Sequence, residues 1–294
     1  MHKIKRILTI LIFAVSFKTY ADDVKIISYI SVETDYEKDG AKGINISYKY
    51  NFLSLEEYDH NDTILKNCTF QLKTTLLSNN EPVEPAIGYM ANTNNNGDLE
   101  YSISLTGKDI EATKFDQQTT QFIPYAAMNL KEGENNITIQ AEMSGKDATG
   151  YLHQDIKEKL GITFNKPPTK LFTMNIDYIE VNVQNTNGNA WDYAYFKTDA
   201  PDVSVTILVG NTSVYKANVN DTYMFAVGPN SKNITFTISE KDKVGVLIQD
   251  IDVLFHDFIA KWNFTTHDKK DGQLYTYDKA KGNIKSCSLN FKIN

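Results

Sequence analysis

The stretch Val203-Ser204-Val205-Thr206-Ile207-Leu208-Val209 places an apolar residue at every second position, with Ser204 and Thr206 between. Successive side chains of a β-strand point to opposite faces, so this period of two predicts a strand with one face against a core. The same alternation recurs along the chain, whereas the helical period of 3.6 residues is scarce. It is found at residues 44–50, 99–105, 136–141, 234–238 and 287–293. The sequence therefore predicts an all-β protein.

Short turn-forming segments separate the predicted strands. They combine Asn, Asp, Gly or Pro, as in Asn95-Asn96-Gly97-Asp98, Lys131-Glu132-Gly133-Glu134 and Gly228-Pro229-Asn230. Such residues supply the backbone conformations that tight hairpin turns need. Many short strands at this spacing are typical of antiparallel β-sandwiches.

The clearest domain boundary is the run Asn165-Lys166-Pro167-Pro168-Thr169-Lys170. A Pro-Pro pair favours extended backbone and cannot lie inside a central strand. We therefore predict a linker at residues 165–170 between two consecutive antiparallel β-sandwich domains. The first, at residues 22–164, is expected to be Ig-like, and the second comprises residues 171–294. Each is the size of one sandwich and is expected to bury its own core.

Residues 1–21 have the layout of a cleavable signal peptide. Three basic residues precede an apolar run at 7–17, and Ala21 stands before the acidic pair Asp22-Asp23. This order of charge, apolar core and small residue predicts export, with cleavage after Ala21. A buried or anchoring N-terminal helix is the alternative. The apolar run is shorter than the roughly twenty residues that span a bilayer, and no later run is long enough to be a transmembrane helix. We expect a secreted or periplasmic protein.

The charge balance argues against nucleic acid as a partner. The chain has a net charge of −7, and the predicted signal peptide carries four of the thirty Lys and Arg residues and no acid, so the mature protein would carry −11. An acidic surface repels phosphate backbones.

The two cysteines, Cys68 and Cys287, lie far apart in the sequence. In an oxidising compartment we expect them to form one disulfide that closes a long loop; two unpaired buried thiols are the alternative.

The N-terminal half contains no recognisable catalytic set. Ser and Thr are frequent, but no Gly-x-Ser-x-Gly nucleophile motif occurs. The aromatic residues Tyr48, Tyr50 and Phe52 fall on one face of a predicted strand and are expected in the core. We expect a protein that is not an enzyme. A glycan hydrolase using paired carboxylates is the weaker alternative, because no acid pair sits in a recognisable aromatic cleft.

Acidic residues gather near the ends of predicted strands in the C-terminal half. They stand in Trp191-Asp192, in Thr198-Asp199-Ala200-Pro201-Asp202, in Glu240-Lys241-Asp242, and at Asp250 and Asp252. This layout resembles the C-two domain, the calcium-dependent lipid-binding β-sandwich of protein kinase C and synaptotagmin. In that family an acid in the first loop precedes an Asp-Pro-like step into a strand, and a later strand ends in an Asp-x-Asp loop with a further acid beyond it.

The resemblance covers about 124 residues and implies a set of calcium ligands. Its members are Asp192, Asp199, Asp202, Glu240, Asp242 and Asp250. The sequence departs from the family at Glu240, which replaces an Asp, and at Asp250, which lies farther along than usual. Calcium takes six to eight oxygen ligands, which carboxylates on neighbouring loops can supply. Ordinary solvated loop acids are the alternative.

The resemblance also implies a membrane-contact surface and a partner. The residues expected to touch the membrane are Tyr195, Phe196, Lys241, Lys243 and Val244. A bound ion can bridge to anionic lipid, or it can rigidify the loops for a protein partner. We therefore expect an exported binding protein, calcium-dependent and engaging a membrane surface or a macromolecular partner. The alternative is a structural or adhesin-like component of a surface or secretion assembly, without metal.

Overall fold

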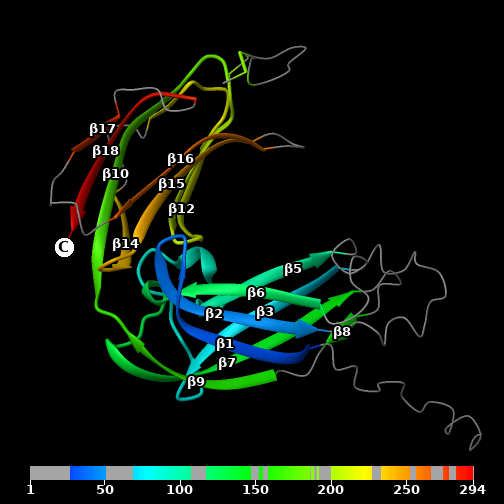
Figure 1. Cartoon of the computed structure of the whole chain (residues 1–294). Helices are drawn as coiled ribbons and strands as arrows, with labels where there is room; N and C mark the ends of the chain where they lie inside the picture. The colour runs from blue at the N-terminus through cyan, green and yellow to red at the C-terminus, as the bar shows by residue number, and fades with distance from the viewer. Residues whose placement is uncertain are drawn as a thin grey trace, which may run out of the picture.

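The computed structural model describes residues 27–50, 69–106, 117–146, 152–154, 158–185, 187–188, 191, 200–226, 233–251, 256–265, 274–277 and 283–293. The predicted fold class is confirmed: antiparallel sheets build the protein, and only two short 3-10 helices interrupt the strands of this part of the chain. None of the described helices is long and apolar enough to cross a membrane. Figure 1 shows one sandwich-like body in each half of the chain.

The N-terminal half contains a three-stranded and a six-stranded sheet. The three-stranded sheet has the order β1-β2-β6, from β1 (Ile27–Lys38), β2 (Ala41–Tyr50) and β6 (Gln117–Pro124). The strands of the larger sheet are β3 (Thr69–Ser78), β4 (Glu81–Pro82), β5 (Glu100–Thr106), β7 (Gly133–Lys146), β8 (Leu152–Gln154) and β9 (Glu158–Lys166). Here β3 and β7 pair at the centre, and β5 and β9 flank them.

Alternating residues of these strands form the N-terminal core. Ile44, Ile46 and Tyr48 of β2 are fully buried, as their period of two predicts. Tyr48 and Tyr50 lie in the core as expected, whereas Phe52 is outside the described residues. The Tyr48 hydroxyl is 2.5 Å from Thr74 Oγ1, which donates to Gln121 Oε1. This satisfied polar group joins the two sheets within an apolar interior.

The C-terminal half contains a five-stranded and a four-stranded sheet. The first is built from β10 (Thr169–Val181), β13 (Met224–Ala226), β14 (Ile234–Ser239), β17 (Leu274–Tyr277) and β18 (Ile284–Ile293). The second has the order β12-β11-β15-β16, from β12 (Thr212–Val219), β11 (Val203–Val209), β15 (Lys243–Ile251) and β16 (His256–Thr265). In the first sheet β10 is central, and it pairs with β13, β14 and β18.

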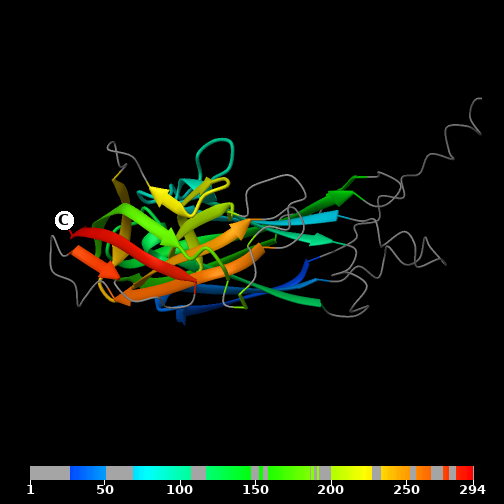
Figure 2. The ribbon, with the colours of Figure 1, turned by 90° about the horizontal axis from the view of Figure 1, so that it is seen from above.

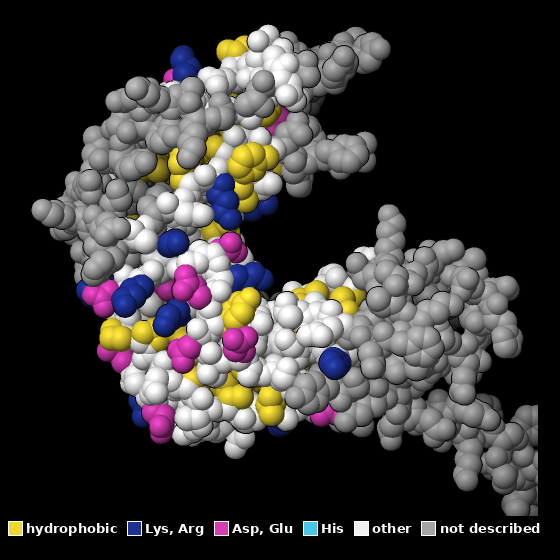
Figure 3. Space-filling model, in the orientation of Figure 1, with side chains coloured by type: hydrophobic (Ala, Val, Ile, Leu, Met, Phe, Trp, Pro, Cys, Tyr) yellow, Lys and Arg dark blue, Asp and Glu magenta, His cyan; other side chains and the backbone are white. Residues whose placement is uncertain are grey.

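Strand pairing separates the two halves at Pro167-Pro168. Of the predicted linker, only these two residues lie outside strands, because β9 ends at Lys166 and β10 begins at Thr169. Figure 2 shows the C-terminal sandwich lying over one end of the N-terminal sandwich, whose strands extend beyond it. The space-filling view shows a hollow between the two bodies (Figure 3).

Each half has its own apolar cluster, but the cluster of the C-terminal half, here called the shared core, also takes in residues of the N-terminal half. One apolar cluster combines C-terminal residues such as Phe236 and Val244 with Tyr89, Phe122 and Ala126 of the N-terminal half. The two 3-10 helices, η1 (Met90–Asn92) and η2 (Tyr125–Ala127), lie at this junction against β12 and β14. Burial of a shared apolar surface holds the two sandwiches in one orientation.

Candidate functional site

The C-terminal sandwich has two ends with different surroundings. We define the junction end by residues 209–212 and 239–243, which lie beside the N-terminal half, and the distal end by residues 181–183, 201–203, 219–224, 249–251 and Phe258. In Figure 1, β10 runs from the junction to the far end of the molecule. Backbone hydrogen bonds tie the distal segments together: Val181 N–H donates to Tyr223, Thr222 N–H to Pro201 and Asn182 N–H to Asn283.

Two of the predicted calcium ligands, Asp202 and Asp250, meet at the distal end. The Asp202 N–H donates to Asp250 Oδ1 at 2.8 Å, and the Ile251 N–H donates to the Asp202 carbonyl oxygen at 3.0 Å. Asp202 Oδ1 in turn accepts the Asp221 N–H at 2.8 Å. Asp250 is fully buried, and Asp202 is partly exposed. Within the described contacts, these two carboxylates hold the ends of β11, β12 and β15 together.

Two others, Glu240 and Asp242, lie in the turn between β14 and β15 at the junction end. Asp242 is 2% exposed. Its Oδ2 accepts the Ser239 N–H at 2.8 Å, and its Oδ1 accepts the Lys42 N–H of the N-terminal half at 3.3 Å. Burial raises the pKa of Asp242 to about 6; the two backbone donors oppose that rise, and the negative charge of Glu37 adds to it.

The six predicted ligands therefore cannot form one site. Asp242 precedes the first residue of β15 and Asp250 lies near the other end of that strand. The two are eight residues apart, and a strand rises about 3.3 Å per residue, so their backbones are about 26 Å apart. Asp242 does not fit as a calcium ligand, because both of its oxygens accept backbone N–H groups in a buried contact. Asp192 and Asp199 lie outside the described residues. Within the described residues, no three His, Cys, Asp or Glu side chains are grouped to hold a metal.

The predicted membrane-contact residues of the same turn also lie at the junction. Val244 is fully buried in the shared core, so it cannot touch a membrane, which corrects that prediction. Lys241 and Lys243 are exposed, but the Lys243 N–H donates to the Gly40 carbonyl oxygen at 2.8 Å. Tyr195 and Phe196 lie outside the described residues. The turn thus joins the two halves of the chain.

The distal end carries apolar side chains that sequence reasoning missed. Among the described residues, large hydrophobic side chains are exposed there at Val183 (65%), Phe258 (60%), Met224 and Val219. Short contacts join their segments: Asn182, beside Val183, donates to Asn283, whose Nδ2 donates to the Phe258 carbonyl oxygen at 3.3 Å. Met224, the first residue of β13, pairs with Glu180 on β10. A short turn connects Met224 to Val219, the last residue of β12.

Phe258 is exposed because of a β-bulge. Ile248 pairs with Ala260 and Gln249 with Phe258, so Ile259 is an extra residue in β16. Ile259 and Ala260 are both buried, and the alternation is shifted by one position. Ala260 and Trp262 of β16 are buried, and an uninterrupted alternation would therefore bury Phe258 on the same face. The sequence alone gave no signal for this bulge.

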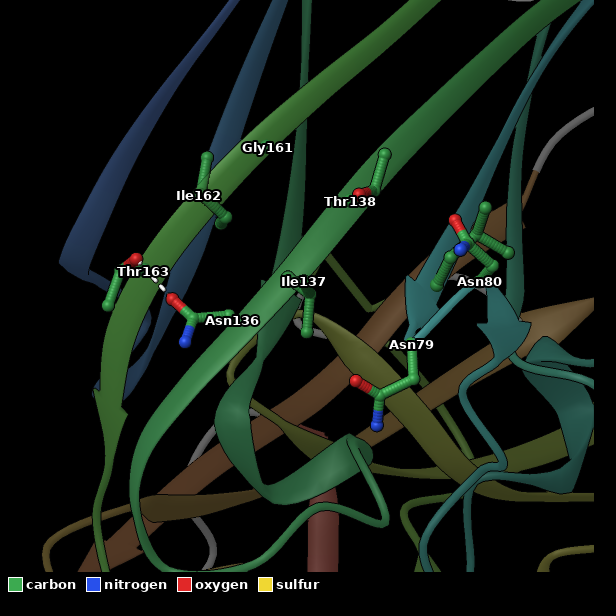
Figure 4. Close-up of a pocket in the computed structure, with 9 residues that line it drawn as sticks. Asn79, Asn80, Asn136, Ile137, Thr138, Gly161, Ile162 and Thr163 are labelled. Carbon is green, nitrogen blue, oxygen red and sulfur yellow. Dashed lines mark hydrogen bonds between the residues drawn. The ribbon is translucent and has the colours of Figure 1, made fainter.

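A shallow cavity of about 380 Å³ lies on the N-terminal sandwich, over β7, β9 and the β3–β4 turn. Figure 4 shows amide and hydroxyl side chains along it together with those of Ile137 and Ile162, and Asn136 Oδ1 accepts a hydrogen bond from Thr163. Its lining residues include no acid, base or thiol. The hydroxyl groups of this lining are those of Thr138 and Thr163.

Cys287 lies buried in the shared core, on β18. Cys68 is outside the described residues, so the disulfide stays a prediction.

The comparisons with known proteins yield little. No protein-family model matches the chain, and no curated protein matches its sequence. Among solved structures, human GIVD cytosolic phospholipase A2 is similar with a TM-score of 0.24 and 7% sequence identity. The match covers 78% of this chain and 33% of the phospholipase chain. A likeness at that level carries no argument about function.

Proposed function

We propose that the chain is an exported, non-enzymatic binding protein that engages an anionic membrane surface through the distal end of its C-terminal sandwich. The observation that carries the proposal is the exposure of Val183, Val219, Met224 and Phe258 at this one end. Apolar side chains gathered at one end of a β-sandwich are suited to insertion at a membrane interface.

The acids at the same end make the proposed contact calcium-dependent. Asp202 and the exposed Asp221 lie beside the apolar residues and would repel anionic lipid. Calcium bound by distal acids would neutralise that charge, in the manner that the C-two resemblance implies. Asp202 and Asp250 are the described members of this proposed ligand set. Asp192 and Asp199, which lie outside the described residues, are added to it only on the C-two resemblance.

A second candidate is a structural or adhesin-like component of a surface assembly, acting without metal through a protein partner. The shared core at the junction favours it, because a fixed angle between two sandwiches suits a component that positions others. This candidate requires neither lipid nor calcium.

Vesicle binding separates the two candidates. Purified protein is sedimented with vesicles of phosphatidylserine and phosphatidylcholine, in calcium and in EDTA. The membrane proposal predicts co-sedimentation in calcium and its loss in EDTA. Equal binding in calcium and in EDTA would contradict the calcium dependence of the proposed contact. No binding in either condition would contradict the membrane contact itself and favour the protein-partner candidate.

A further inference from the structure

A second cavity, of about 360 Å³, lies where the two sandwiches meet. Its walls come from both halves of the chain: the segments at 85–87 and 128–130, Lys166, the segment at 169–171, and Thr237 of β14. Six of its eleven lining residues are apolar, and the other five carry polar or charged side chains. The apolar lining residues are Pro85, Ala86, Ile87, Met128, Leu130 and Leu171.

One buried cation, Lys166, lines this cavity. Lys166 is the last residue of β9 and continues the inward-facing row of Ile162 and Phe164. Its side chain therefore belongs to the interior face of the strand, at the end nearest the junction. Lys166 is only 4% exposed, although Lys is among the residue types that are rarely buried.

The ammonium group of Lys166 has little compensation from the described residues. Its Nζ donates to Thr169 Oγ1 at 3.3 Å, and no carboxylate in the described part of the chain forms an ion pair with it. Glu132 is the neighbouring acid, but its Oε1 accepts the Thr169 N–H at 3.2 Å. Burial lowers the pKa of Lys166, and the charge of Glu132 opposes that effect. An ammonium has three donors, so two remain for an acceptor in the cavity.

We propose that the junction cavity binds a small organic carboxylate with a short apolar chain, and that Lys166 pairs with its carboxylate group. Buried charges are stabilised by an opposite charge and hydrogen bonds, which a carboxylate supplies together. The apolar lining then covers the chain of the ligand. Lys170, exposed at the same cavity, adds a second positive charge. This site lies at the other end of the C-terminal sandwich from the proposed membrane contact.

Calorimetric titration of the full protein with sodium hexanoate and with hexanamide tests the proposal. The two probes have nearly the same shape, and only hexanoate carries a charge. We expect hexanoate to bind at least about tenfold more tightly, the range of a charge-assisted hydrogen bond. Equal affinities for the two probes, or no binding of hexanoate up to about 50 mM, would overturn the proposal.

Two variants assign the effect to Lys166. Lys166→Met keeps the side-chain length and removes the charge, and it should abolish the preference for hexanoate over hexanamide. Lys159→Met removes a charge from the exposed face of the same strand and should leave the preference unchanged. A preference that survives Lys166→Met would also overturn the proposal. The comparison of probes on the unmodified protein stands even if a variant fails to fold.

Discussion

The Asp242 carboxylate of the C-terminal sandwich accepts the backbone N–H of Lys42 in the N-terminal sandwich, at 3.3 Å. The same turn holds a second cross-junction bond, from the Lys243 N–H to the Gly40 carbonyl oxygen. A residue that the family resemblance assigns to an exposed calcium loop is thus part of the contact between the halves. Variants in this turn therefore test the contact between the halves, and variants at the distal end test the proposed membrane contact.

Replacing Asp242 by Ala should destabilise the protein. The change leaves the buried N–H group of Ser239 without its acceptor, at a cost of roughly 1–3 kcal/mol, and removes the weaker, partly buried bond from the Lys42 N–H. Chemical denaturation with urea measures the loss in the free energy of unfolding. Glu240→Ala, in the exposed position of the same turn, is the matched control and should change stability by no more than about 0.5 kcal/mol. Equal effects of the two variants would contradict the assigned role of Asp242.

The raised pKa of Asp242 predicts a specific pH dependence of stability. The folded pKa of about 6 exceeds the ordinary value of 3.8, so between these values the folded state binds more protons than the unfolded state. Stability contributed by this group is therefore greatest below pH 4 and falls as the pH rises towards 6, by about 3 kcal/mol in total. Asp242→Asn cannot titrate. The difference in unfolding free energy between the two proteins should change across this pH range, and a constant difference would contradict the prediction.

Two glycines with similar φ angles test how closely the halves approach. Gly88 has a φ of +92°, and a Cβ there would lie 2.2 Å from Phe236 Cβ across the junction. Gly133 has a φ of +88°, but a Cβ there would meet no atom within 4 Å. Gly133→Ala should cost about 1–2 kcal/mol from backbone strain alone. Gly88→Ala should cost about 1–3 kcal/mol more, because the overpacked junction must also shift. Urea denaturation of both variants measures the difference, and equal losses would show that the junction is looser than this contact implies.

Calcium should raise the melting temperature of the protein relative to EDTA, because an ion that binds only the folded state stabilises it. The shift should disappear in Asp202→Asn and persist in Asp242→Asn, since only Asp202 lies at the distal end. Differential scanning calorimetry of the three proteins in both conditions measures it. A shift that is lost only in Asp242→Asn would place the ion at the junction instead.

Local alternation predicts most of the strands but not their tertiary contacts. The opening stretch, residues 203–209, is β11, and its central apolar residues Val205 and Ile207 are fully buried. Ser204 and Thr206 are buried as well, so both faces of this strand are covered, whereas the alternation predicted only one. The alternation fails at Phe258, where one inserted residue reverses the face of the strand.

The candidate site was only partly predictable, because its geometry depends on which ends of the strands meet. Asp202 and Asp250 are 48 residues apart in the sequence, yet the pairing of β11 with β15 brings them into contact. The same pairing sends Asp242 to the opposite end. Asp242 contacts Lys42 across the junction between the halves, which local sequence patterns do not encode.

The most direct test of the proposed function is vesicle co-sedimentation, in calcium, of two variants that each remove one exposed apolar side chain. Phe258→Ser acts at the distal end, and Ile87→Ser acts at the junction, where Ile87 is exposed to a similar extent, 56%. Loss of an inserted Phe forfeits roughly 1.5–3 kcal/mol, so Phe258→Ser should weaken vesicle binding about tenfold or more. Ile87→Ser should bind as the unmodified protein does. Binding that is unchanged by Phe258→Ser, or weakened equally by both, would contradict a membrane contact at the distal end.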